Sequence, residues 1–218
     1  MIKIAIAFGV LVTATLIMKK PGMSYRQSVL KTIYPAIMWS SKAAGKKQTL
    51  TNTKNAASTV SFYTLSVKDI NGNEFKFSDL KGKKILIVNT ASNCGFTGQY
   101  EALEKLAQQF GNKLVVVGFP SNDFKEQEAG ANTDIASFCK KNYGVTFPLM
   151  EKSMVIKGQA QNEVHKWLSD ISINGWCNQE PAWNFCKYLV NEQGVLTHYF
   201  PMTVDPMAPE VICAIEAK

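Results

Sequence analysis

Acidic residues are absent from the first 60 positions of this sequence, and arginine is absent from positions 61 to 218. The first 60 positions hold nine lysines and arginines, which leaves 24 − 9 = 15 basic residues against all 17 acidic ones in positions 61–218, a charge of about −2. The formal net charge of +7 therefore comes from the N-terminal part. A nucleic-acid-binding face needs a basic patch on the folded domain, so we expect no nucleic-acid partner.

The sequence also lacks paired cysteines and paired histidines. None of its five cysteines has a partner at the two-residue spacing of a zinc or redox motif, and His165 and His198 have no ligand-spaced partner. We therefore expect no disulfide framework, no metal and no cofactor. Cys139, Cys186 and Cys213 lie in apolar stretches and are interpreted as small core residues. The two histidines are interpreted as satisfied or exposed side chains.

Residues 1–20 contain one uncharged apolar run, residues 4–18, between Lys3 and the Lys19-Lys20 pair. The run is shorter than the roughly 20 residues of a comfortable membrane span and long for a signal-peptide core of about 7 to 15 residues. It predicts a membrane anchor or a signal segment. The more positive C-terminal flank favours the cytoplasmic face, whereas a secretory signal would place the protein on the periplasmic or exported side.

Residues 21–60 form a basic segment before the predicted domain. Apolar residues in 23–44 recur at spacings of three and four, with basic residues between them, and the pattern breaks near Pro35. This predicts an amphipathic helix that lies among lipid headgroups or, alternatively, an ordinary helix packed on the domain. Residues 45–59 are polar and unpatterned, so they are interpreted as a linker.

Residues 61–218 alternate short apolar runs with helical periods, which predicts one α/β domain. A hairpin is expected over 61–77, and strands over 84–89, 114–119, 185–190 and 195–200. Helices are expected over 99–110, 134–143 and 161–171. This order predicts a central mixed sheet flanked by helices, with an N-terminal β-hairpin.

Cys94 lies where a predicted buried strand passes through a short polar turn into a helix. Unpaired N–H groups and the helix dipole favour a thiolate at such a place, and a thiolate is the nucleophile that attacks a peroxide bond. A second thiol three places on would indicate dithiol exchange, but Thr97 stands there. One-thiol chemistry through a sulfenic acid is therefore favoured, and the alternative is a turn cysteine with an ordinary pKa.

Three motifs in order resemble the glutathione peroxidase family, in the subgroup with cysteine where other members have selenocysteine. They are Asn89 to Thr97, Gly118 to Glu128 and Trp183 to Phe185. The resemblance implies a thioredoxin-like fold for residues 61–218 and a site made of Cys94, Gln127, Trp183 and Asn184. The last three side chains offer uncharged N–H donors to a thiolate and a departing hydroxide. Taken singly, Trp183 also fits a core aromatic, Gln127 a solvated loop and Asn184 a strand-edge turn.

The resemblance implies a thiol-dependent peroxidase that reduces hydrogen peroxide and organic or lipid hydroperoxides in defence against oxidative stress. The alternatives are a thioredoxin-like thiol-disulfide oxidoreductase, which Thr97 argues against, and a non-catalytic membrane-anchored module. Residues 147–183 are compact, like the short phospholipid-hydroperoxide members. This similarity implies a monomer with a site open to bulky peroxides.

The thiol reductant stays open between a thioredoxin-like protein and glutathione. Ser121 occupies the place after the Phe-Pro pair, where the thioredoxin-dependent branch often has a resolving cysteine, and Cys177 is a weak substitute in a loop. The lack of arginine in 61–218 removes the forked clamps that suit the carboxylates of glutathione.

Overall fold

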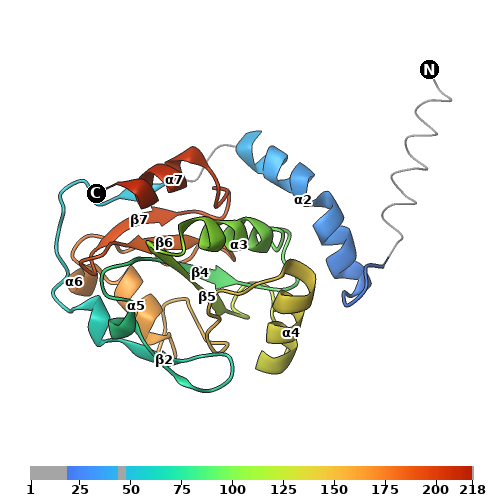
Figure 1. Ribbon diagram of the computed structural model, residues 1–218, viewed down its shortest axis with the longest axis horizontal. Helices are drawn as coiled ribbons and strands as arrows, with labels where there is room; N and C mark the ends of the chain where they lie inside the picture. The colour runs from blue at the N-terminus through green and yellow to red at the C-terminus, as the bar shows by residue number, and fades with distance from the viewer. Residues whose placement is uncertain (1–18, 44–47, 218) are drawn as a thin grey trace.

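The computed structural model describes residues 19–43 and 48–217, and a five-stranded sheet forms the centre of the described part (Figure 1). The strand order is β1-β7-β6-β4-β5. The strands are β1 (Leu50–Thr51), β4 (Lys84–Thr90), β5 (Leu114–Pro120), β6 (Lys187–Val190) and β7 (Leu196–Phe200). The pair β4 and β5 is parallel and the other pairs are antiparallel, so the predicted mixed sheet is confirmed.

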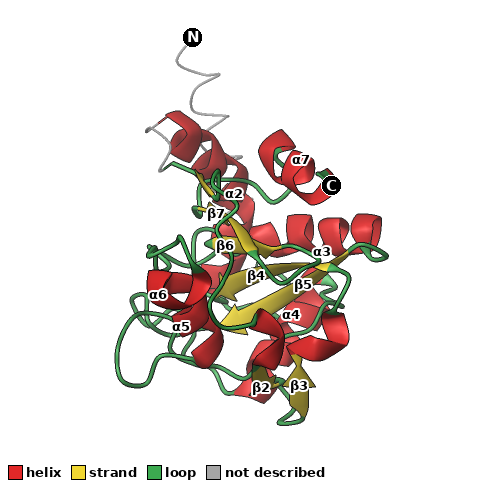
Figure 2. Cartoon of the chain, turned by 90° about the vertical axis from the view of Figure 1, so that its left-hand side faces the viewer, coloured by secondary structure: helices red, strands yellow, loops and turns green. Residues whose placement is uncertain are grey.

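Core side chains cover both faces of this sheet. Along β4, Leu86 and Val88 belong to one apolar cluster, whereas Ile85 and Ile87 belong to a second cluster, because successive side chains of a strand point to opposite faces. The first cluster includes side chains of α3 (Gln99–Phe110), α4 (Asn132–Tyr143) and α7 (Pro209–Glu216). The second includes side chains of α5 (Glu163–Ser169), and Figure 2 shows α3 on one side of β4 and β5 and α5 with α6 (Ile171–Asn174) on the other.

The predicted hairpin is present but short. β2 (Ser66–Lys68) and β3 (Glu74–Lys76) pair antiparallel, and 3-10 turns at Phe62–Thr64 and Phe77–Leu80 flank them. Phe62 and Phe77 are fully buried in the second cluster. The hairpin is therefore attached to the domain by these two aromatic side chains.

Two helices differ from the prediction. The expected helix over 161–171 is divided into α5 and α6, because Asp170 leaves the helical conformation and its side chain accepts a hydrogen bond from Ser172 N at 2.9 Å. α7 follows a loop and begins with Pro209, a residue favoured in the first helical turn. Cys213, predicted in the core, lies on the exposed side of α7.

α2 (Tyr25–Ala43) lies before the family-like domain and packs against it (Figure 1). The helix continues through Pro35, where a break was predicted. Proline removes one hydrogen bond from a helix interior, but both halves of α2 are held: Lys31 before the proline pairs with Glu101 at 2.8 Å, and Met38 after it is buried. In the structure α2 is thus packed on the domain, and contact of its exposed side with lipid headgroups stays a prediction.

The segment predicted as a linker is also part of the folded unit from residue 48 onward. Leu50 and Thr51 extend the sheet by pairing with Tyr199 and His198. Asn52 is buried, and its side-chain amide donates to the carbonyls of Ala56 and Leu196. A polar residue of this segment, which shows no periodic pattern in the sequence, therefore forms hydrogen bonds with backbone carbonyls at the edge of the sheet.

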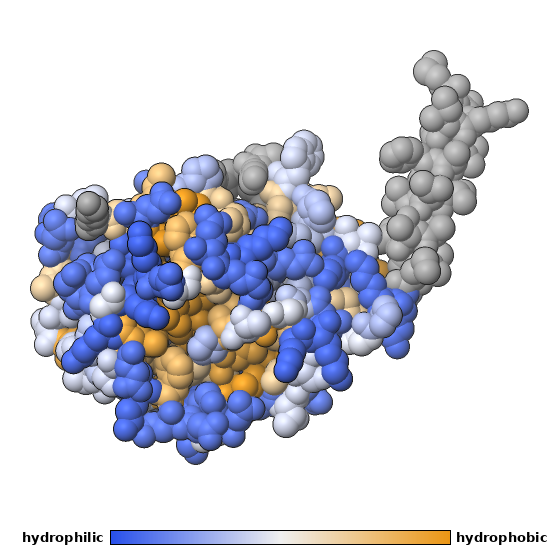
Figure 3. Space-filling model, viewed as in Figure 1, coloured by the Kyte–Doolittle hydropathy of each residue, from blue (hydrophilic) through white to orange (hydrophobic). Residues whose placement is uncertain are grey.

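Hydrophilic side chains cover most of the face shown in Figure 3, and apolar residues are visible towards its middle. Within residues 19–43 and 48–217, no helix is long and apolar enough to span a membrane. The apolar run 4–18, predicted as an anchor or signal, lies outside the described residues.

Candidate active site

Cys94 lies in the turn that joins β4 to α3. Its side chain is 1% exposed, and Phe96 N–H donates a hydrogen bond to its sulfur at 3.4 Å. α3 begins only at Gln99, so this donor comes from the turn and not from the regular helix end. Cys94 thus lies near a helix N-terminus, as the sequence predicts. The hydrogen bond to its sulfur, however, comes from the turn.

Thr97 stabilises the turn at the place where a second redox thiol would stand. Its hydroxyl accepts from Cys94 N–H at 3.0 Å, and it lies 2.7 Å from the Cys94 carbonyl and 2.8 Å from the Ala91 carbonyl. A single hydroxyl therefore links both ends of the turn. This geometry fixes the backbone around the thiol.

The turn of Cys94 contacts the loop that carries Gln127. Asn93 N–H donates to the Gln127 carbonyl at 3.0 Å, and the Asn184 side-chain amide donates to Gln127 Oε1 at 3.0 Å. Asn184 is fully buried, and its Oδ1 has no hydrogen-bond partner among the described residues. The structure thus brings residues from three distant segments to one place.

Trp183 is held at this place by the end of β4. Asn89 Nδ2 donates to the Trp183 carbonyl at 3.0 Å. The indole ring lies 5.5 Å from the Phe124 ring, between centroids, and Lys125 Nζ lies 5.7 Å from the indole centroid. Asn89 was noted only as part of the first motif, and its position at the end of a buried strand was the available signal for this role.

Two opposing effects act on the Cys94 thiol. Burial raises its pKa above the ordinary value and is the larger effect. Hydrogen bonds from Phe96 N–H and from the Trp183 and Asn184 side chains lower the pKa, as does the positive charge of Arg26. The net direction is upward, which differs from the thiolate expected from a helix N-terminus, because removal of water from the sulfur outweighs the donors.

The backbone beside the site is strained. Among the described residues, four other than glycine have a positive φ, and three of them flank the site: Lys125 (50°), Glu126 (51°) and Phe185 (66°). The first two precede Gln127 and the third follows Asn184. Such residues cost about 1 to 3 kcal/mol each and persist only where the surrounding structure imposes them. No pattern in the sequence predicts this strain.

Glu128 is a buried carboxyl that the sequence reading did not single out. It is 1% exposed, and Ser92 Oγ donates to its Oε2 at 3.1 Å. Burial raises its pKa to about 7, against the lowering effects of Ser92 and of the Lys152 charge. Because Ser92 stands two residues before Cys94, this contact joins the thiol turn to the second motif.

The other cysteines lie on two sides of the sheet. All five are free thiols. Cys139 belongs to the apolar cluster that contains Cys94, whereas Cys177 and Cys186 belong to the cluster on the opposite face. Cys177, predicted as a weak substitute partner for Cys94, is 2% exposed and belongs to the cluster on the opposite face of the sheet from Cys94.

His165 differs from the prediction of a satisfied or exposed side chain. It is fully buried between the rings of Phe119 and Tyr188, and neither ring nitrogen has a partner in the described part of the chain. Burial lowers its pKa to about 3. His198 is partly buried, with Nδ1 3.0 Å from Thr197 Oγ1. Across residues 19–43 and 48–217, no three His, Cys, Asp or Glu side chains are grouped as metal ligands.

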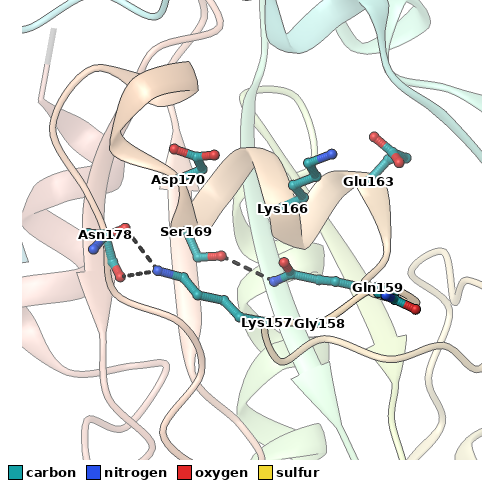
Figure 4. Close-up of a pocket in the computed structure, with 9 residues that line it drawn as sticks. Lys157, Gly158, Gln159, Glu163, Lys166, Ser169, Asp170 and Asn178 are labelled. Atoms are coloured by element: carbon teal, nitrogen blue, oxygen red, sulfur yellow. Dashed lines mark hydrogen bonds between the residues drawn. The ribbon is translucent and has the colours of Figure 1, made fainter.

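A polar pocket of about 380 Å³ lies apart from these residues (Figure 4). Its lining groups already bond to one another: Lys157 Nζ donates to Asn178 Oδ1 at 2.8 Å, and Gln161 Nε2 donates to Ser169 Oγ at 3.2 Å. None of Cys94, Gln127, Trp183 and Asn184 lines it. The candidate active site is therefore the Cys94 turn and not this pocket.

Comparisons with known proteins cover a large part of this chain. A family model described as glutathione peroxidase matches residues 62–169. The chain is 45% identical over 153 residues to the glutathione peroxidase-like peroxiredoxin GPX5 of Chlamydomonas reinhardtii, covering 69% of this chain and 93% of the relative. It is 47% identical over 134 residues to the glutathione peroxidase-like peroxiredoxin gpx1 of Schizosaccharomyces pombe, covering 61% of this chain and 84% of the relative.

Solved structures agree on the fold. The crystal structure of Trgpx in apo form is 33% identical, with a TM-score of 0.54 over 72% of this chain and 97% of that one. The crystal structure of T. cruzi GPX1 is 26% identical, with a TM-score of 0.54 over 71% of this chain and 92% of that one. These similarities confirm the predicted thioredoxin-like fold with its mixed sheet.

Proposed function

Because the chain belongs to the glutathione peroxidase family and is a thiol-dependent peroxidase that reduces hydroperoxides, we propose that Cys94 is the thiol that attacks the peroxide. The observation that carries this proposal is the position of Cys94: Phe96 N–H donates to its sulfur at 3.4 Å, and the nearby Trp183 and Asn184 side chains lower its pKa. Uncharged donors around a buried sulfur stabilise negative charge at the moment it develops.

The proposed reaction begins when the Cys94 thiolate attacks one oxygen of the hydroperoxide. An S–O bond forms, the O–O bond breaks, and the departing oxygen takes up a proton and leaves as an alcohol or water. Cys94 becomes a sulfenic acid. A first thiol then displaces water and forms a mixed disulfide, and a second thiol releases Cys94 and completes a disulfide. Two thiols are oxidised for each peroxide reduced.

We assign different parts in this reaction to the other three residues. Trp183 and Asn184 donate to the sulfur, as their effect on the Cys94 pKa indicates. Gln127 Oε1 accepts from the Asn184 amide and so orients that donor. Asn184 Oδ1, which is buried without a partner among the described residues, is free to accept a hydrogen bond from the peroxide O–H.

For the reductant we propose a thioredoxin-like protein rather than glutathione. The absence of arginine from residues 61–218 leaves that part of the chain without the forked group that binds carboxylates in pairs. Peroxide consumption followed by stopped flow, with dithiothreitol, a thioredoxin and glutathione supplied separately, tests this choice of reductant. A wild-type enzyme that turns over faster with glutathione than with thioredoxin at equal thiol concentration contradicts the choice of reductant.

We also propose that residues 1–20 attach the enzyme to a membrane, with residues 21–60 joining them to the catalytic domain of residues 61–218. The uncharged run 4–18 and the positive residues that flank it support this proposal. The test compares the full chain with one that begins at Lys19, which keeps α2 and β1 in place. The full chain should sediment with vesicles containing anionic lipid, and the shorter one should not. Equal sedimentation of the two chains would show that residues 1–18 do not attach the enzyme to the membrane.

A further inference from the structure

α2 lies against the turn that carries Cys94. A Cβ atom added to Gly98 would lie 2.5 Å from Tyr34 Cδ1 and 2.8 Å from Tyr34 Cδ2. A Cβ atom added to Gly95 would lie 3.1 Å from Ile37 Cδ1. The two glycines on this turn therefore leave the space that the Tyr34 ring and the Ile37 side chain occupy.

Several contacts fix α2 in this position. Lys31 Nζ lies 2.8 Å from Glu101 Oε1 of α3 and donates to the Asn142 carbonyl of α4 at 2.8 Å. The same ammonium group lies 4.2 Å from the centroid of the Tyr143 ring. Met23, just before α2, belongs to the apolar cluster that contains Cys94. One end of α2 is thus tied to α3 and α4, and the helix then passes across the thiol turn.

The two α2 side chains that contact the turn are uncharged, whereas Arg26 of the same helix acts on Cys94 through its positive charge. Burial, with the nearby Asp205 carboxylate, raises the pKa of Tyr34, so the side chain is a neutral phenol at physiological pH. Ile37 is aliphatic and stands next to Gly95, the residue after Cys94. The match to the family model begins at residue 62, so both side chains come from a helix that precedes the matched region.

We propose that Tyr34 and Ile37 of α2 are specificity-determining residues, which narrow the approach to Cys94 and favour small hydroperoxides over bulky ones. This inference rests on the proposed role of Cys94. It also revises the open site that the compact segment 147–183 led us to expect, because α2 occupies one side of the thiol turn. A bulky peroxide must displace the Tyr34 ring or the Ile37 side chain, whereas hydrogen peroxide need not.

The test uses the full chain with dithiothreitol as reductant and measures second-order rate constants for hydrogen peroxide and for cumene hydroperoxide. Tyr34→Ala and Ile37→Ala should each raise the cumene-to-hydrogen-peroxide ratio by about tenfold, the lower range of steric discrimination in a pocket. The matched controls are Tyr25→Ala and Ile171→Ala, at side chains that are 53% and 51% exposed, and they should leave the ratio unchanged.

A purely structural role of α2 gives a different result, since a loosened turn would slow both peroxides and leave the ratio constant. Gly98→Ala provides a second variant, because its new methyl group should push the Tyr34 ring aside and raise the ratio as well. An unchanged ratio in folded Tyr34→Ala and Ile37→Ala overturns the inference. Cys94→Ser measured in parallel separates this outcome from failure of the proposed function, which would show as peroxide consumption that survives in Cys94→Ser.

Discussion

The side chains around Cys94 are held by residues that have no part in the chemistry we propose. Asn89 binds the backbone of Trp183, and Thr97 links the ends of the thiol turn. The motifs identified Cys94, Trp183 and their neighbours from the sequence, because residue types and order are enough to recognise a family. The strained backbone at Phe185 could not be predicted, since only the surrounding contacts impose it.

At the residue scale, Trp183→Phe tests the indole donor. The substitution keeps the aromatic ring against Phe124 and removes the N–H, so the second-order rate constant with hydrogen peroxide should fall by about 100-fold. Trp176→Phe is the matched control, because the Trp176 N–H donates to the Leu196 carbonyl at 2.6 Å and not to Cys94. Equal rate constants for wild type and Trp183→Phe would exclude Trp183 from the mechanism.

His165 predicts a pH dependence of stability. Its pKa is about 3 in the folded chain and about 6.5 when unfolded, so between these values the unfolded state binds one proton more. Above pH 6.5, His165 does not affect the free energy of unfolding. As the pH is lowered from 6.5 towards 3, His165 lowers this free energy by about 1.4 kcal/mol per pH unit. The free energy of unfolding, measured with urea at pH 6.5, 5.5 and 4.5, should lose this pH dependence in His165→Leu. Parallel slopes for both proteins would show that His165 finds a partner when folded.

Among the elements, α3 and β4 could be predicted because each has one strong pattern. β4 is a continuous apolar run buried on both faces, and α3 has one apolar stripe, so their bounds follow from the sequence to within a residue. α2 and β1 could not be predicted in place, because the contacts that hold them lie more than 50 residues away in the chain. α7 was missed since its eight residues are too few for a periodic signal.

The two faces of the sheet predict where an internal disulfide forms. Cys139 on α4 shares the core cluster of Cys94, and the sheet separates Cys94 from Cys177. After one equivalent of hydrogen peroxide without reductant, mass spectrometry should find Cys94 as a sulfenic acid or joined to Cys139. Burial raises the Cys139 pKa to about 12, so this step should be slow unless α4 opens. A peptide joining Cys94 to Cys177 would contradict the separation by the sheet.

For the whole molecule, the structure makes the catalytic domain depend on residues that precede the family match. α2 buries Met38 and makes the Lys31–Glu101 ion pair, and β1 extends the sheet. The charge asymmetry of the sequence predicted a separate basic segment, and the described part of that segment is packed on the domain instead. Composition cannot show this, because lysines beside an acidic residue and lysines beside lipid look the same in a sequence.

Truncation tests this dependence. A chain that begins at Lys19 should melt within about 2 °C of the full chain in detergent. A chain that begins at Ser61 loses the burial of Met23 and Met38 and the β1–β7 pairing, so its Tm should fall by about 5 °C or more, given about 2 to 4 °C for each kcal/mol in a domain of this size. Equal Tm values for the two shorter chains would mean that α2 and β1 contribute nothing to stability.

The role of Cys94 is the centre of the account, and one measurement tests it most directly. Wild type and Cys94→Ser are mixed with hydrogen peroxide and dithiothreitol, peroxide consumption is followed by stopped flow, and a sulfenic-acid probe followed by mass spectrometry locates the oxidised residue. We predict consumption at the background rate in Cys94→Ser and the probe on Cys94 in wild type. Cys94→Ser consuming peroxide at the wild-type rate, or the probe found on another cysteine, would contradict the account.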